Sequence, residues 1–119
     1  TIETETEIDI LMNETEKTKL CLDASHIALV GEDPVKHITK YIDRLSYMHL
    51  KDWAKGEFTE LGEGTIGIDF PAIFDTLNAL KFTGWVVVEH SVSQKSALVS
   101  AQFNANYLKD LGYSLEVTR

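Results

Sequence analysis

Residues 85–89 read Trp85-Val86-Val87-Val88-Glu89, a short apolar run that ends in an acid. Two further runs have the same form: Lys19-Leu20-Cys21-Leu22-Asp23 ends in an aspartate, and Leu45-Ser46-Tyr47-Met48-His49-Leu50 carries a histidine near its end. Apolar runs of this length predict buried strands. A charged or imidazole group at the end of a buried strand is costly unless it has a partner. The three runs therefore indicate both a fold and a candidate site.

Helical patterns separate these runs. Apolar residues recur at helical spacing in four segments, predicting helices over residues 4–17, 34–44, 70–80 and 95–111. We expect the first strand to begin at Thr18 and residues 51–67 to form a polar loop. The last helix is expected to bury Leu98, Ala101 and Leu108. His37 is expected on an exposed helix face, and His90 is expected to point away from the side that Glu89 faces; neither is assigned a role.

The predicted element order is αβαβαβα, which favours an α/β fold with a parallel sheet covered by helices. At 119 residues the chain is shorter than a complete eight-stranded barrel, which takes about 250 residues. Three strands alone leave exposed sheet edges, and such edges pair with other chains. We therefore expect residues 1–119 to be part of a barrel, without a complete domain boundary inside the chain, and to self-associate or form a homo-oligomer. A small doubly wound sheet is the structural alternative.

Composition narrows the possible partners. The formal net charge of −8 argues against binding to nucleic acid or to an anionic membrane. No apolar stretch is long enough to span a bilayer, and the single cysteine, Cys21, suits a reducing compartment. These features predict a cytoplasmic protein. The chain begins Thr1-Ile2-Glu3, without an initiator methionine, and we expect it to derive from a larger protein.

Asp23, His49 and Glu89 are the candidate metal ligands. The carboxyl ends of parallel strands meet at one edge of a sheet, where α/β barrels build their active sites. Two carboxylates and an imidazole suit a divalent ion, with Mn²⁺ or Co²⁺ foremost and Mg²⁺ or Zn²⁺ as alternatives. The competing interpretation is that Asp23 caps a turn, His49 packs in the core and Glu89 pairs with a lysine.

Two neighbouring residues are candidates for substrate binding. His26 follows Asp23 by three positions and would lie in the loop above the strand, where it could reach a substrate or a second metal. Lys51 faces the same way as His49 and could hold a substrate oxygen or balance the carboxylates. The simpler alternatives are an exposed loop histidine and an exposed lysine.

With these residues in place, the chain resembles the C-terminal part of the xylose-isomerase-like TIM-barrel superfamily of sugar isomerases, epimerases and inosose dehydratases. Five stretches carry the resemblance, in the family's order: Cys21-Leu22-Asp23-Ala24-Ser25-His26, Gly31-Glu32-Asp33-Pro34, Arg44-Leu45-Ser46-Tyr47-Met48-His49-Leu50-Lys51-Asp52, Leu61-Gly62-Glu63-Gly64-Thr65-Ile66-Gly67-Ile68-Asp69-Phe70 and Gly84-Trp85-Val86-Val87-Val88-Glu89.

The resemblance implies that the chain covers strands six to eight of the barrel. It implies that Asp23, His49 and Glu89 bind one divalent metal, that His26 contacts substrate oxygens, and that Glu89 is also a catalytic acid/base group. The reaction implied is isomerisation, epimerisation or dehydration of a sugar or cyclitol through a metal-stabilised enediolate. The family's fourth ligand, a glutamate, would lie before Thr1, so the isolated chain is expected to be inactive.

The reaction itself stays open at this level. The His49-Leu50-Lys51-Asp52 stretch and the ending of the last strand are most similar to inosose dehydratases. Endonuclease-IV-like repair enzymes belong to the same superfamily, but they need further histidine ligands, and residues 53–60 contain none. The other alternative is a noncatalytic fragment or assembly module.

Overall fold

The computed structural model describes residues 2–90 and 94–113, and its centre is a parallel three-stranded sheet. The strands are β1 (Leu20–Asp23), β2 (Leu45–Leu50) and β5 (Trp85–Val88), with β2 in the middle. β1 pairs with β2, and β2 with β5, both in parallel register. The predicted α/β class with a parallel sheet is confirmed.

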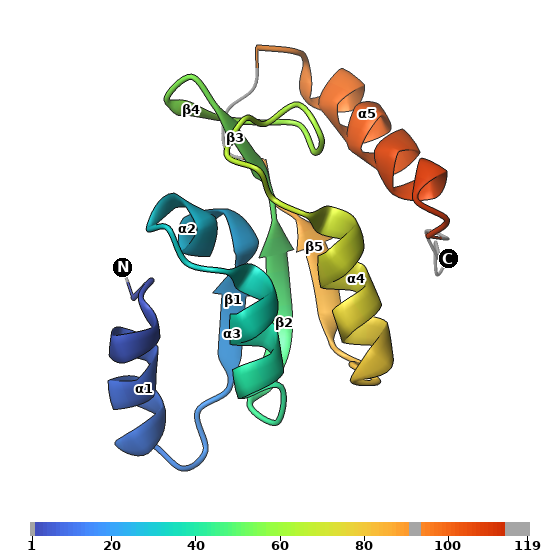
Figure 1. Ribbon diagram of the computed structural model, residues 1–119. Coiled ribbons are helices and arrows are strands. Elements are labelled where there is room, and N and C mark those ends of the chain that lie inside the picture. The colour runs from blue at the N-terminus through green and yellow to red at the C-terminus, as the bar shows by residue number, and fades with distance from the viewer. Residues whose placement is uncertain (1, 91–93, 114–119) are drawn as a thin grey trace.

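In the part of the chain that the structure describes, five helices and a hairpin accompany this sheet. α3 and α4 lie over one face, α1 lies beside β1, and α2 and the hairpin lie above the arrowheads of the strands (Figure 1). The bounds of these elements are α1 (Glu5–Asn13), α2 (Ala24–Leu29), α3 (Pro34–Tyr41), β3 (Asp52–Ala54), β4 (Glu57–Thr59), α4 (Phe70–Ala79) and α5 (Ala97–Asp110).

Local sequence explains where the helices begin. Thr4 forms a capping box with Glu7 at the start of α1. Asp33 and Asp69 accept backbone N–H bonds at the starts of α3 and α4, each with a proline in the first turn. Acceptor side chains at these positions satisfy N–H groups that have no partner within the helix.

Some boundaries and elements differ from those predicted. α1 ends at Asn13 and β1 begins at Leu20, so both elements are shorter than expected. The short helix α2 was not predicted, and it follows β1 directly because Asp23 caps it. The polar segment after β2 is not simply a loop, since it contains the antiparallel hairpin of β3 and β4.

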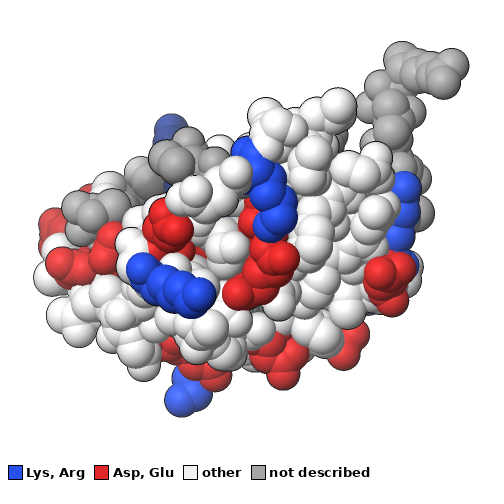
Figure 2. Space-filling model, turned by 90° about the horizontal axis from the view of Figure 1, so that it is seen from above, with Lys and Arg blue, Asp and Glu red and all other residues white. Residues whose placement is uncertain are grey.

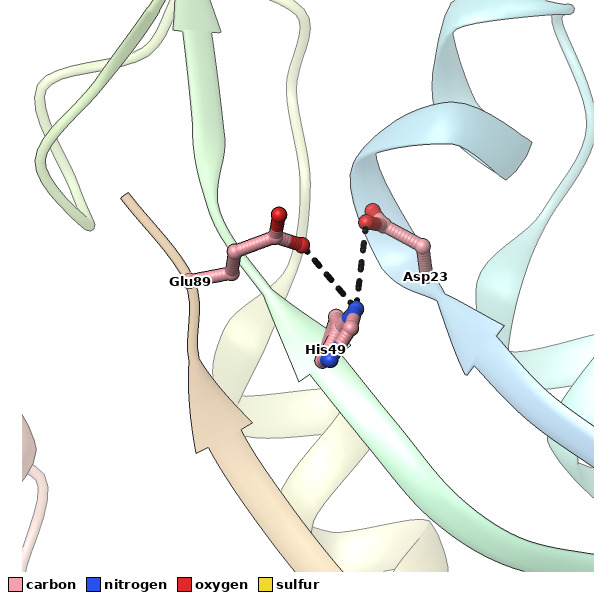
Figure 3. Close-up of side chains that lie close together, drawn as sticks. All are labelled: Asp23, His49 and Glu89. Atoms are coloured by element: carbon pink, nitrogen blue, oxygen red, sulfur yellow. Dashed lines mark ion pairs between the residues drawn. The ribbon is translucent and has the colours of Figure 1, made fainter. Parts of the chain in front are cut away.

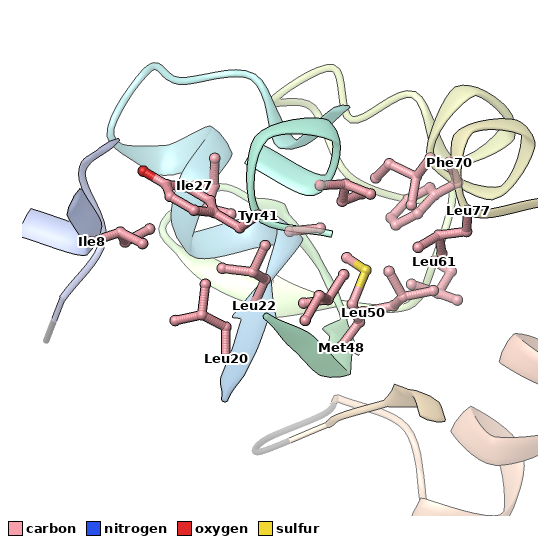
Figure 4. Close-up of a cluster of buried hydrophobic side chains, with 14 of the residues drawn as sticks. Ile8, Leu20, Leu22, Ile27, Tyr41, Met48, Leu50, Leu61, Phe70 and Leu77 are labelled. Atoms are coloured by element: carbon pink, nitrogen blue, oxygen red, sulfur yellow. The ribbon is translucent and has the colours of Figure 1, made fainter. Parts of the chain in front are cut away.

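The hydrophobic core lies between the sheet and its covering helices. Met48 and Leu50, from the middle strand, are fully buried, and so are Ile38 of α3 and Ile73 of α4. The side chains of this cluster project from β1, β2 and the helices toward a shared interior, as Figure 4 shows. Burying them is the main favourable term in folding.

The opposite face of the sheet has little cover among the described residues. Cys21, Tyr47 and Trp85 are register partners across the three strands and share this face. Cys21 is exposed, and Trp85 keeps 71% of its surface accessible. An exposed tryptophan on a sheet face is unusual in a self-contained domain, and it agrees with a partial barrel whose interior face is open.

Two predictions of burial were wrong. α5 buries Leu108, as expected, together with Ser100 and Asn104, whereas Ala101 is exposed and Leu98 is 80% exposed. The polar pair is buried because Asn104 accepts the Leu61 N–H at 2.8 Å and Ser100 donates to Glu60 at 2.7 Å.

His37 was expected on an exposed face but is only 2% exposed. Its Nε2 lies 2.8 Å from Glu32 Oε2, and its Nδ1 lies 3.1 Å from the Asp33 carbonyl oxygen. The Asp33 carbonyl gives the buried ring a hydrogen-bond partner at Nδ1, whereas the contact of Nε2 with the Glu32 carboxylate lacks hydrogen-bond geometry.

Charged side chains of both signs are mixed on the face seen in Figure 2. Viewed from above, in Figure 2, basic side chains stand singly among acidic and uncharged ones on the described part of this face. Within the described residues, no helix is both long and apolar enough to cross a membrane.

Candidate metal centre

Strand register brings the three candidate ligands to one edge of the sheet. Asp23 and His49 are directly paired in the alignment of β1 with β2. Glu89 follows β5, and its N–H donates to the Leu50 carbonyl at 2.9 Å, which continues the ladder by one step. All three residues therefore lie at the carboxyl ends of adjacent parallel strands.

Their donor atoms converge. One ligand atom from each of Asp23, His49 and Glu89 lies within 4.8 Å of the others. His49 Nδ1 lies 3.0 Å from Glu89 Oε2 and 4.0 Å from Asp23 Oδ2. Figure 3 shows both carboxylates turned toward the imidazole from the two flanking strands.

Asp23 caps α2, as the competing interpretation expected, and also faces the cluster. Its Oδ1 accepts the backbone N–H groups of Ser25 at 2.9 Å and His26 at 3.2 Å, which caps α2. Its Oδ2 points toward His49 and Lys51. The cap therefore fixes the carboxylate with one oxygen aimed at the site.

Lys51 is at the centre of the cluster and not on the surface. Its side chain is only 4% exposed, and its Nζ lies 3.0 Å from Asp23 Oδ2 and 2.9 Å from Glu89 Oε2. The hydrogen bond from Lys51 lowers the pKa of Glu89. Burial works to lower the pKa of Lys51, but hydrogen bonds to both carboxylates outweigh it and raise that pKa. The alternative of an exposed lysine is wrong.

His26 lies at the mouth of the same cluster. Its Nδ1 lies 3.0 Å from Glu3 Oε1, and its Nε2 lies 3.9 Å from Asp23 Oδ2. Both His26 and Glu3 line a pocket of about 300 Å³ together with Asp23, His49, Lys51 and Glu89. Glu3 was not predicted, because it precedes the first helix and no pattern links it to the strand ends.

The hairpin adds an aromatic side chain that was also missed. The ring centroid of Phe58 lies 4.4 Å from Lys51 Nζ and 5.6 Å from the His26 ring. The sequence feature that could have indicated this hairpin is Gly56, which takes a positive φ of 88° at the turn. Recognising that turn would have paired Trp53 with Phe58 across the two short strands.

The donor set fits a divalent cation. Two carboxylates and one imidazole are oxygen and nitrogen ligands of the kind that Mn²⁺, Co²⁺ and Zn²⁺ accept. Convergence at the carboxyl edge of a parallel sheet, outside the strands, is the place where α/β-barrel proteins build their sites. Fold and cluster together define an α/β-barrel protein with a candidate metal centre.

Comparison with known proteins gives the family. A model of the family described as "Xylose isomerase-like TIM barrel" matches residues 4–113. The chain belongs to this family, as its resemblance to it had indicated.

Named relatives of this chain agree with the family assignment. An inosose dehydratase from Geobacillus thermodenitrificans is 36% identical, over 74% of this chain and 36% of that protein. The rhizopine catabolism protein MocC from Rhizobium meliloti is 33% identical, over 74% of this chain and 33% of that protein. The chain thus spans about a third of the length of these relatives.

Solved structures show the same fold. A sugar phosphate isomerase/epimerase from Parabacteroides distasonis matches 88% of this chain and 36% of its own, with a TM-score of 0.72 and 21% identity. An L-ribulose 3-epimerase matches 98% of this chain and 36% of its own, with a TM-score of 0.63 and 22% identity. At this identity the likeness is one of fold.

Proposed function

We propose that the chain is the C-terminal part of a metal-dependent sugar or cyclitol enzyme, with β1, β2 and β5 as strands six to eight of its barrel. Two observations support this placement. The chain covers about a third of its relatives' length, and the sheet face that carries Trp85 is open. The remaining strands of a barrel would cover that face.

Asp23, His49 and Glu89 are proposed as ligands of one divalent ion. The observation that carries the proposal is the convergence of their donor atoms within 4.8 Å from three adjacent strands. Mn²⁺ or Co²⁺ is proposed foremost, because a mixed oxygen and nitrogen set suits both ions. When bound, a divalent ion polarises a carbonyl oxygen and stabilises the charge that develops there as a neighbouring proton leaves.

The surrounding side chains suit a small polyol. Glu89 is proposed as an acid/base group as well as a ligand, since a carboxylate beside the substrate can remove and return a proton. His26 and Lys51 are proposed to bind substrate oxygens, because both line the pocket at the cluster. A glutamate from an upstream strand is proposed to complete the site, so the isolated chain is expected to be inactive.

Dehydration of an inosose is the favoured reaction. The curated relatives include inosose dehydratases, which supports it, while the structural neighbours include an epimerase. Both reactions begin by removing a proton next to a carbonyl, and they differ in whether a hydroxyl group then leaves. A cytoplasmic location is proposed with this metabolic role, and the single cysteine supports it.

The test is a reaction of the full-length protein with an inosose in D₂O containing Mn²⁺. Mass spectrometry then measures the product. Loss of one water molecule from the inosose would support the dehydratase. Deuterium uptake next to the carbonyl without loss of water would point to an epimerase or isomerase instead. The proposed function would be contradicted if a protein that binds Mn²⁺ showed neither loss of water nor deuterium uptake with any of several keto sugars.

A further inference from the structure

The ammonium group of Lys51 lies on the same oxygens that the proposed metal would use. Its Nζ contacts Asp23 Oδ2 at 3.0 Å and Glu89 Oε2 at 2.9 Å. Those two oxygens are also the ones nearest His49 Nδ1. A divalent ion bound there would lie beside a positive charge, and like charges at such distances repel strongly where water is excluded.

Phe58 covers the ammonium group from the hairpin side. The ring centroid lies 4.4 Å from Lys51 Nζ, a distance at which an aromatic face attracts a cation. The ring is itself fixed, because Trp53 packs edge-on against it with the centroids 4.7 Å apart. Phe58 also lines a second pocket, together with other residues of the hairpin.

The backbone around Lys51 is held as firmly as its side chain. Ser25 Oγ donates a hydrogen bond to the Lys51 carbonyl. The next residue, Asp52, is buried and accepts N–H bonds from Gly62 and Gly64, both at 3.0 Å. Because neighbouring residues of an extended chain point to opposite sides, anchoring Asp52 one way directs Lys51 toward the carboxylates.

We propose that Phe58 is a positioning residue that acts through Lys51: its ring holds the ammonium group on Asp23 and Glu89, and thereby weakens the affinity of the site for a divalent ion. The part that concerns metal affinity rests on the proposed function. The part that concerns the position of Lys51 does not. In the intact site, a substrate oxygen that accepts the ammonium group would relieve the competition, so metal and substrate would bind cooperatively.

The first experiment measures how accessible the Lys51 amine is. The purified chain is treated with trace acetic anhydride, and acetylation of each lysine is measured by peptide mapping, with the exposed Lys55 and Lys81 as internal references. Phe58→Ala should raise the relative acetylation of Lys51 by about fivefold or more, the scale of a partly buried cation–π contact. Phe58→Leu should behave like Phe58→Ala, whereas Phe58→Tyr should resemble the parent chain.

The second experiment is a double-mutant cycle on Mn²⁺ binding, measured by calorimetry. Phe58→Ala and Lys51→Met should each tighten Mn²⁺ binding, and the double variant should bind no more tightly than Lys51→Met alone. This non-additivity is the signature of a residue that acts through another. Circular dichroism of every variant checks that the fold is retained.

The outcomes separate the two proposals. Unchanged acetylation of Lys51 in Phe58→Ala, or fully additive effects on Mn²⁺ affinity, would overturn the role of Phe58. If the full-length protein and its Lys51→Met variant both fail to bind Mn²⁺ while acetylation of Lys51 rises as expected, the metal proposal fails, but the positioning of Lys51 by Phe58 is supported.

Discussion

His49 and Glu89 meet across neighbouring parallel strands, with His49 Nδ1 3.0 Å from Glu89 Oε2. Strand register produces this contact. His49 is paired with Val87, and Glu89 lies two positions further along the same face. The geometry of the cluster therefore depends on the pairing of β2 with β5 more than on any loop.

Removing either partner should remove metal binding. We expect His49→Gln and Glu89→Gln each to weaken Mn²⁺ binding beyond the roughly 100-fold that loss of an outer-shell partner can cost. Calorimetry of the purified protein measures this affinity. The matched control is Asp75→Asn, which removes an exposed carboxylate of α4 away from the cluster. Equal loss in the control variant would show that net charge, not ligation, is responsible.

Gly64 should not tolerate a side chain. A Cβ added at this position would overlap the carboxylate of Asp52, which accepts the N–H groups of Gly62 and Gly64. We expect Gly64→Ala to lower the free energy of unfolding by about 1–3 kcal/mol, as overpacking typically does. Urea denaturation measures the change. Thr65→Ala, at an exposed neighbouring position, should have little effect.

Truncating a core side chain of the sheet should lower the free energy of unfolding, whereas truncating the exposed Leu98 of α5 should not. Met48 is fully buried, and Met48→Ala should lower the free energy of unfolding by about 2–5 kcal/mol. Leu98 is exposed, and Leu98→Ala should change it by no more than about 0.5 kcal/mol. Similar losses for both in chemical denaturation would contradict the observed packing of α5.

Acidification should weaken the attachment of α1 to α3. Lys40 Nζ lies 2.7 Å from Asp9 Oδ2, and Tyr41 donates to Asp9 at 2.8 Å. The hydrogen bonds from Lys40 and Tyr41 lower the pKa of Asp9. A lowered pKa means that the folded state binds the proton less well than the unfolded chain. The stabilisation is therefore complete above the ordinary carboxyl pKa and disappears as pH falls through the lowered one.

The measurement that follows is unfolding by urea across a series of pH values. The difference in stability between the parent chain and Asp9→Asn should shrink on acidification. Glu16→Gln, an exposed control beyond the end of α1, should show no such trend. A difference that is constant with pH would show that the Asp9 contacts do not depend on charge.

The open face of the sheet should drive self-association. Trp85 is largely exposed beside Tyr47 and Cys21 on the face opposite the core. We expect the isolated chain to associate, and Trp85→Lys to shift it toward monomer in analytical ultracentrifugation. Leu98→Lys changes an equally exposed apolar side chain on α5, away from this face. An equal shift in that control would mean that apolar exposure in general, and not this face, drives association.

Sequence was sufficient for the parallel sheet and for the meeting of the strand ends, because short apolar runs fix the strands and parallel strands share an edge. Asp23, His49 and Glu89 could be placed together on that basis alone. The direction of Lys51 also followed from the sequence, because it lies two positions beyond His49. Its burial against Phe58 and the anchoring of Asp52 did not, since these contacts come from a hairpin too short to show an alternating pattern.

The buried face of α5 was predicted only in part, for a different reason. Leu108 is buried as expected, but Asn104 and Ser100 turn inward although the alanines and leucines of the helix suggest an apolar face. They do so because the Leu61 backbone and the buried Glu60 carboxylate need hydrogen-bond partners. Helical periodicity depends only on the apolar residues of the helix itself, so it does not reveal hydrogen-bonding groups in a distant segment.

Asp23 carries a consequence for which substitutions this position can accept. One oxygen starts a helix and the other faces the cluster, so two separate requirements fall on a single side chain. Asparagine would satisfy the helix and fail the cluster, since it caps well but carries no charge. Glutamate would keep the charge and lose the short reach that capping needs. Aspartate alone meets both demands, and divergence at this position should therefore mark relatives that have given up the site while keeping the fold.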